Sequence, residues 1–137
     1  MSEPRTLSLL PWQVTLAEFN QKAGEVGPDG ACCAFVVDSS IPPAARGGYA
    51  SLVMAFSRAD EPVCVLDDGA ALVLVRDGGI ASGKALAERV FVQMRRLALE
   101  LTLTAGIAPI GDDPSQAATA ARAAAESVPA GQVGTQA

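Results

Sequence analysis

Three aspartates stand where this chain could hold a divalent cation. Asp67 and Asp68 are adjacent, and Asp38 ends an apolar run. Carboxylate oxygens are the ligands that Mg²⁺ prefers, so the three side chains would form an acidic metal site if the fold brought them together. The alternative is conformational, because Asp-Gly, here Asp68-Gly69, is a common sequence in tight hairpin turns. We favour the turn and predict no bound metal.

Other residue types that do chemistry are scarce. The chain has no histidine, which removes the usual general base and the commonest metal ligand. Cys32 and Cys33 are adjacent, so in a strand they point to opposite faces, and we expect both to be small buried hydrophobic residues. An odd set of three cysteines fits a reducing compartment, and the N-terminus lacks a signal-peptide pattern. We therefore predict a cytoplasmic protein with no catalytic residue and no cofactor.

Length and charge limit the organisation and the partners. The 137 residues are enough for one domain. We expect an irregular lead-in over 1–14, a single domain over 15–128 and a flexible tail over 129–137. The net charge of -5 argues against nucleic acid as a partner. No apolar stretch approaches the ~20 residues of a membrane span, so we predict no membrane contact.

Helix and strand patterns alternate along the domain. A capping box of Thr15 and Glu18 opens the first helix, and Asp113-Pro114 opens the last. Two strand-like runs, 63–66 and 71–75, flank the Asp-Gly turn and predict a hairpin. The other expected elements are a strand over 31–38, a helix over 44–58, a helix over 82–97 with Ser82 as N-cap, and a strand over 101–108. This order predicts an α/β (α+β) fold: a ferredoxin-like βαββαβ core with a mixed or antiparallel sheet, plus one N-terminal and one C-terminal helix.

The helix over 82–97 has more apolar residues than one narrow face needs. Its predicted buried face consists of Leu86, Val90, Met94 and Leu97. Phe91 and Val92 lie off this face. Either the buried face is wide, which we favour, or Phe91 and Val92 form an interface with a partner.

This ordered set resembles the GGDEF domain of bacterial diguanylate cyclases over about Thr15 to Gly131. The run Phe35-Val-Val-Asp38 resembles the family's first strand, which ends in a metal-binding aspartate. The hairpin over 63–75 resembles the one that gives the family its name. The strand over 101–108 resembles the family's Thr-Val-Ser-Ile-Gly-Ile-Ala.

The resemblance is to a degenerate member. The signature maps onto residues 67–71, where Asp67 and Asp68 replace two glycines and Ala70 replaces an acid that helps to hold metal. Ser40 replaces a second aspartate after the first strand. The loop after Asp38 is shorter and lacks the family's guanine-recognition segment, and the lysine near the end of the last helix has no counterpart. The resemblance thus implies that Asp38, Asp67 and Asp68 are the remnant of an active site without cyclase activity.

One functional motif of the family has a match. In that family an Arg-x-x-Asp motif just before the hairpin binds cyclic di-GMP as a feedback inhibitor, and Arg58-Ala-Asp-Glu61 lies in the same register. An arginine can grip phosphate or a guanine edge, and a carboxylate can accept from guanine N–H groups. The alternative is that Arg58 is an ordinary solvated residue at a helix end.

We predict a catalytically inactive GGDEF-like regulatory module of bacterial signalling. It would act through contact with another signalling protein or with itself, for example as a homodimer. Two alternatives stay open. One is a sensor of cyclic di-GMP or GTP that uses Arg58 and Glu61. The other is a roadblock-like GTPase regulator, which the absence of an Ala-rich last helix would favour.

Overall fold

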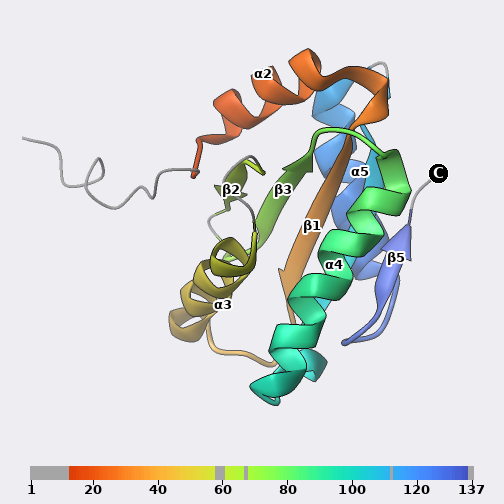
Figure 1. The fold of residues 1–137 in the computed structure, drawn as a ribbon. Coiled ribbons are helices and arrows are strands. Elements are labelled where there is room, and N and C mark those ends of the chain that lie inside the picture. The colour runs from red at the N-terminus through yellow and green to blue at the C-terminus, as the bar shows by residue number, and fades with distance from the viewer. Residues whose placement is uncertain (1–12, 58–60, 67, 112, 136–137) are drawn as a thin grey trace, which may run out of the picture.

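The computed structural model describes residues 13–57, 61–66, 68–111 and 113–135 (Figure 1). Its helices are α2 (Leu16–Val26), α3 (Pro43–Phe56), α4 (Gly79–Arg96) and α5 (Pro114–Glu126). Its strands are β1 (Ala31–Val37), β2 (Val63–Val65), β3 (Ala71–Val75), β4 (Leu103–Pro109) and β5 (Val133–Thr135). Short 3-10 turns over Gly27–Asp29 and Glu100–Thr102 precede β1 and β4. Of the predicted lead-in, only Gln13 and Val14 lie within the described residues, and they run beside β2.

The strands form one sheet in the order β2-β3-β1-β4-β5. β1 is antiparallel to β3 and β4, and β2 is antiparallel to β3. This is the predicted ferredoxin-like core. β5 adds a parallel strand beside β4, which makes the sheet mixed. The prediction of a flexible tail is therefore wrong for Val133–Thr135, because backbone bonds to β4, including Gly131 N to Leu103 O at 2.8 Å, hold the chain that leads into β5.

Helices cover both faces of the sheet. α3 and α4 pack on one face, and α2 and α5 pack on the other (Figure 1). β1 lies at the centre and is buried from both sides, which explains its continuous apolar sequence. Cys33 faces α3 and α4 while Cys32 faces α2 and α5, as strand alternation predicted. Burial raises the pKa of both thiols, that of Cys32 to about 12.

α5 packs closely on the sheet because small residues meet there. The buried face of α5 consists of Ala117, Ala121, Ala124 and Ala125. Opposite it, a Cβ atom added to Gly106 of β4 would lie only 1.9 Å from the Ala121 carbonyl oxygen. A glycine is therefore required in β4 at this contact. The presence of an Ala-rich last helix argues against the roadblock-like alternative. None of the helices in the described part of the chain is both long and apolar enough to cross a bilayer.

Local side-chain caps explain where two helices begin. At α2 the Thr15 hydroxyl accepts from Glu18 N at 3.2 Å, and Glu18 Oε1 accepts from Thr15 N at 3.1 Å. This is the predicted capping box. At α5, Asp113 Oδ1 accepts from Ser115 N at 3.1 Å, so the predicted N-cap is also confirmed.

α4 differs from its prediction at both ends. The helix ends at Arg96, so the prediction that Leu97 is buried is wrong: Leu97 lies at the C-cap and is 50% exposed. The helix begins at Gly79 rather than after Ser82, because Gly78 adopts a φ of 86° and turns the chain into the helix earlier.

Phe91 of α4 is 2% exposed and belongs to the core, and Val92 is half-buried. The buried face is thus wide, as favoured, and the alternative of an interface does not hold for Phe91, because its side chain is buried in the core.

Candidate functional site

The β2–β3 turn carries Asp68, one of the predicted remnant residues, whereas Asp38 follows β1. Leu66 N donates to Ala70 O at 2.8 Å, and Gly69 N donates to Leu66 O at 2.9 Å, which closes a tight turn. Gly69 has a φ of 90°, so the glycine of the Asp-Gly sequence serves the turn as expected. Ala70 N also donates to Asp68 Oδ1 at 3.1 Å. Asp67 lies outside the described residues.

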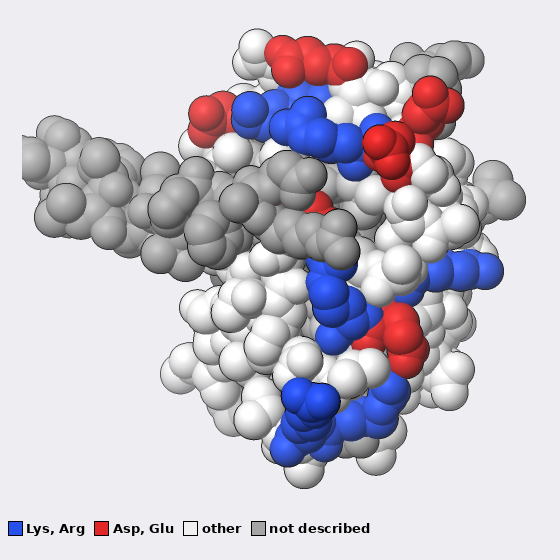
Figure 2. All heavy atoms as spheres, viewed as in Figure 1, with Lys and Arg blue, Asp and Glu red and all other residues white. Residues whose placement is uncertain are grey.

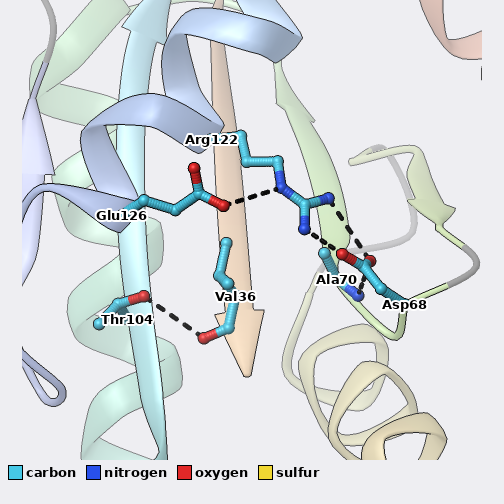
Figure 3. A network of polar contacts seen from close by, with 6 residues as sticks. All are labelled: Val36, Asp68, Ala70, Thr104, Arg122 and Glu126. Atoms are coloured by element: carbon cyan, nitrogen blue, oxygen red, sulfur yellow. Dashed lines mark hydrogen bonds and ion pairs between the residues drawn. The ribbon is translucent and has the colours of Figure 1, made fainter. Parts of the chain in front are cut away.

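Arg122 of α5 reaches this turn (Figure 3). Its Nη2 forms a close ion pair with Asp68 Oδ2, and its Nη1 donates to Asp68 Oδ1 at 3.4 Å. Its Nε donates to Glu126 Oε2 at 3.3 Å, one helical turn further along α5. The side chains of Arg122 and Asp68 are 29% and 41% exposed, so the pair lies at the rim of the fold. A guanidinium cation therefore stands beside the one turn aspartate that the structure describes.

Hydrogen bonds favour the ionised form of Asp38 and Asp68, the two remnant aspartates that lie within the described residues. Arg122 lowers the pKa of the Asp68 carboxyl, chiefly through its hydrogen bonds, and the pKa of Arg122 is raised in return. Hydrogen bonds from the Ser40 side chain and from Ser40 N, the latter at 3.0 Å, lower the pKa of Asp38. Ser40 thus acts as a donor to Asp38. Each of these carboxylates therefore has a hydrogen-bond donor from the protein itself.

A cavity of about 410 Å³ lies between the end of β1, the turn and the end of α5. Its ionisable wall residues are three carboxylates, Asp38, Asp68 and Glu126, and two guanidinium groups, Arg46 and Arg122. Arg46 comes from α3, and it donates from Nε to Ile41 O at 2.9 Å and from Nη2 to Ser39 O at 3.3 Å. Both cavity arginines are therefore engaged by the protein itself.

The chemistry open to this cavity is limited. Among the described residues, no group of three or more carboxylate, thiol or imidazole side chains is placed to hold a metal ion. Ala70, the residue after Gly69 in the turn, is 2% exposed and offers only a methyl group. In this arrangement the positive charge of Arg122 on α5 balances the negative charge of Asp68 in the turn.

The second predicted site is described in part. Arg58 lies outside the described residues. The Glu61 side chain is 12% exposed, and its Oε1 accepts from Arg89 Nη2 at 2.6 Å. Arg89 of α4 also donates from Nε to Phe56 O at 3.0 Å. The pair lines a hollow of about 190 Å³ to which Arg76 also contributes.

Sequence reasoning identified neither Arg89 nor Arg122. They lie 28 and 54 residues from their partner carboxylates. The only available signal was position on a helix: each arginine adjoins a buried residue, Val90 or Ala121, and so stands at the edge of the buried face.

No protein-family model and no curated protein matches the sequence. Solved structures match with probability 1.00. The diguanylate cyclase SiaD from Pseudomonas aeruginosa, solved in complex with its activator SiaC, is 19% identical with a TM-score of 0.67; the match covers 88% of this chain but only 55% of that one. The GGDEF domain of YfiN (TpbB) from the same organism is 19% identical with a TM-score of 0.65, over 93% of this chain and 99% of that one. The FimX GGDEF domain, also from P. aeruginosa, is 14% identical with a TM-score of 0.63, over 90% and 94%.

These matches agree with the predicted fold class. At 19% identity and below, they establish the fold alone. The chain has the GGDEF-like fold.

Proposed function

We propose that this chain is a cytoplasmic regulatory module of bacterial signalling that lacks cyclase activity and acts through contact with another protein. The observation that carries the proposal is the ion pair between Asp68 of the signature turn and Arg122 of α5. It puts a fixed side-chain cation beside a carboxylate in the turn where the family holds its catalytic metal.

Cyclase chemistry needs divalent cations at this turn. Such ions neutralise the triphosphate and lower the pKa of the attacking hydroxyl. Here Asp68 is neutralised by Arg122, Asp38 accepts from Ser40, and Ala70 has no carboxylate. A metal ion would have to displace Arg122 and would gain few oxygen ligands in return. These features support the loss of activity.

The loss of activity is tested with the purified full chain. It is incubated with GTP and Mg²⁺ or Mn²⁺, beside an active cyclase as a positive control, and cyclic di-GMP is sought by chromatography and mass spectrometry. We expect no product. The variant Arg122→Gln removes the guanidinium and should also give none, because Ala70 still lacks a carboxylate. Formation of cyclic di-GMP by the unaltered chain would refute the proposal.

Protein contact as the mode of action is supported by SiaD, a protein of this fold that was solved with its activator SiaC. To test this, the tagged chain is used to purify bound proteins from the organism that encodes it. Each recovered protein is then purified, and its binding to the purified chain is measured. We expect a complex with a Kd of about 10 μM or tighter. Failure of every recovered candidate to bind the purified chain would contradict this part of the proposal.

A second candidate function is binding of cyclic di-GMP or GTP beside Glu61. It is favoured by the hollow that Glu61, Arg76 and Arg89 line, because guanidinium groups bind phosphate in a fork geometry. Calorimetry with each nucleotide tests it. Arg58→Ala and Arg89→Ala should abolish the binding heat, whereas Arg95→Ala, on the same helix as Arg89, should leave it unchanged. No heat from the unaltered chain would reject this function.

A further inference from the structure

The turn between β2 and β3 is held from both helical layers. On one side, Arg122 of α5 forms the ion pair with Asp68. On the other side, Gly69 lies directly against α3, because a Cβ atom added to it would be 2.6 Å from Arg46 Cβ. α5 and α3 cover opposite faces of the sheet (Figure 1). The turn therefore joins two layers that the sheet separates.

The contacts continue from α3 into the loop that follows β1. Arg46 Nε donates to Ile41 O at 2.9 Å, and its Nη2 donates to Ser39 O at 3.3 Å. Ile41 N donates in turn to Asp38 O at 3.0 Å, at the end of β1. Three of these four residues line the cavity of about 410 Å³ that the ion pair also lines. A series of contacts therefore runs along the cavity wall from α5, through the turn and α3, to β1.

The ion pair is the link of this series that ions in solution can open. The Arg122 and Asp68 side chains are 29% and 41% exposed, so water and salt compete for both of them. An exposed pair of this kind favours its closed form over its open form by only about two- to fivefold. The other links are packing against Gly69 and hydrogen bonds to backbone carbonyl groups, which carry no net charge.

Its place in the fold distinguishes this pair from other charged groups of the surface. Basic and acidic side chains adjoin one another on much of the face that Figure 2 shows. An ion pair such as Arg95 with Glu88 joins two residues of α4, so its opening leaves the elements of the fold where they are. Opening of the pair between Arg122 and Asp68 instead frees the turn from α5.

We propose that the Arg122–Asp68 pair is a latch that couples α5 to α3 through the turn. When the latch is closed, the turn is held against α3, and Arg46 keeps the loop after β1 in place. Salt, or an anionic group of a partner that binds Arg122, opens the latch, and the hold on Arg46 weakens. The inference rests on the proposed function, because a module that acts through contact needs a way to pass a change from one surface to another.

Nuclear magnetic resonance on the isotope-labelled full chain tests the latch at both of its ends. Arg122→Gln opens the latch, so we expect the protection of the Ala70 amide against hydrogen exchange to fall about two- to fivefold. The Arg46 Nε–H resonance should also shift, and the protection of the Ile41 amide should fall, because the turn no longer holds α3. Arg95→Gln, which removes an exposed ion pair within α4, is the matched control and should change none of these signals.

Two further measurements examine the coupling itself. Coupling is reciprocal, so Arg46→Gln should lower the protection of the Ala70 amide and shift the Arg122 Nε–H resonance. Raising NaCl to about 0.5 M should lower the protection of the Ala70 amide in the unaltered chain and leave it unchanged in Arg122→Gln, where no ion pair remains to be screened. Asp68→Asn opens the same link from the turn and should reproduce the changes at Arg46.

Thermal melts confirm that each variant folds. Signals of Arg46 and Ile41 that stay unchanged in both Arg122→Gln and Asp68→Asn overturn the inference, because the turn then loosens without α3. A salt response as large in Arg122→Gln as in the unaltered chain overturns it as well. The cyclase assay and the partner reconstitution test the proposed function by separate measurements, so its failure and the failure of the latch can be told apart.

Discussion

Replacing Arg122 by glutamine should make the protein less stable at neutral pH and less sensitive to acid. In the folded chain Arg122 lowers the pKa of Asp68 below its ordinary value of about 3.9. Such a carboxyl stabilises the fold at pH values above its unfolded-state pKa, and this stabilisation is lost as the pH falls through the folded-state pKa. Arg122→Gln removes the main cause of the lowered pKa of Asp68. The stability that Asp68 loses in acid should therefore be absent from this variant.

The expected size follows from exposure. The two side chains are 29% and 41% exposed, so water screens most of their attraction. Arg122 contacts Asp68 through two nitrogens, one to each carboxylate oxygen, which is a favourable geometry for a surface ion pair. We therefore expect the pair to contribute about 0.5–1 kcal/mol to the free energy of unfolding. A loss of several kcal/mol would require a buried pair, which this one is not.

The assay is urea unfolding from pH 7 down to about pH 2, below the unfolded-state pKa. A double-mutant cycle of Arg122→Gln and Asp68→Asn isolates the interaction, which should be about 0.5–1 kcal/mol at pH 7 and near zero at the acid end. Arg95→Gln, which removes an exposed arginine elsewhere, should leave the pH dependence unchanged. The reasoning would be refuted by an interaction energy near zero at pH 7, or by an acid-dependent loss of stability as large in Arg122→Gln as in the unaltered chain. Part of that loss should remain in the variant, because Ser40 still lowers the pKa of Asp38.

Three further substitutions test the fold around the sites by chemical or thermal unfolding. Gly106→Ala should destabilise by about 3 kcal/mol or prevent folding, because the new Cβ would lie 1.9 Å from Ala121 O; a change below about 1 kcal/mol would mean that α5 does not sit as described. Ala98→Gly should stabilise by about 0.5–1 kcal/mol, since it relieves the φ of 59° in the turn after α4, where Leu99 N donates to Met94 O at 2.8 Å. A loss of stability would contradict this left-handed conformation. Glu61→Gln should cost about 1–2 kcal/mol by weakening the bond to Arg89, and an unchanged midpoint would show that this pair contributes nothing.

The core of the fold was predictable because its signals are local. The capping pair Thr15 and Glu18, the Asp-Gly turn and the uninterrupted apolar run of β1 each specify an element within a few residues. β5 was missed because Val133–Thr135 is short and contains a glycine, which gives no local strand signal. Its pairing with β4 depends on where the chain lies after the end of α5. The early start of α4 depends on the φ of Gly78, which composition does not reveal.

The site was predictable in place but not in its contacts. Strand order put Asp38 and Asp68 at the ends of elements that meet, and both line the same cavity. The partner of Asp68 could not be read from the sequence, because it lies 54 residues away and depends on the rotation of α5 about its axis. The partner of Glu61 could not be read from the sequence either. Arg89 is one of several basic residues on α4, and only the packing of α4 determines which of them contacts Glu61.

The small residues of α5 and the ion pair at the turn belong to one arrangement. Gly106 and the alanine face let α5 lie close to β4, and Arg122 follows the fully buried Ala121 at the edge of that face. A bulkier face would lift the helix and carry the guanidinium away from Asp68. Ala121→Val should therefore lower toward zero the interaction energy between Arg122 and Asp68 that a double-mutant cycle measures. It should also reduce the stability by about 1–3 kcal/mol through overpacking. A folded Ala121→Val protein with an undiminished cycle energy would show that the position of Arg122 does not depend on how closely α5 packs.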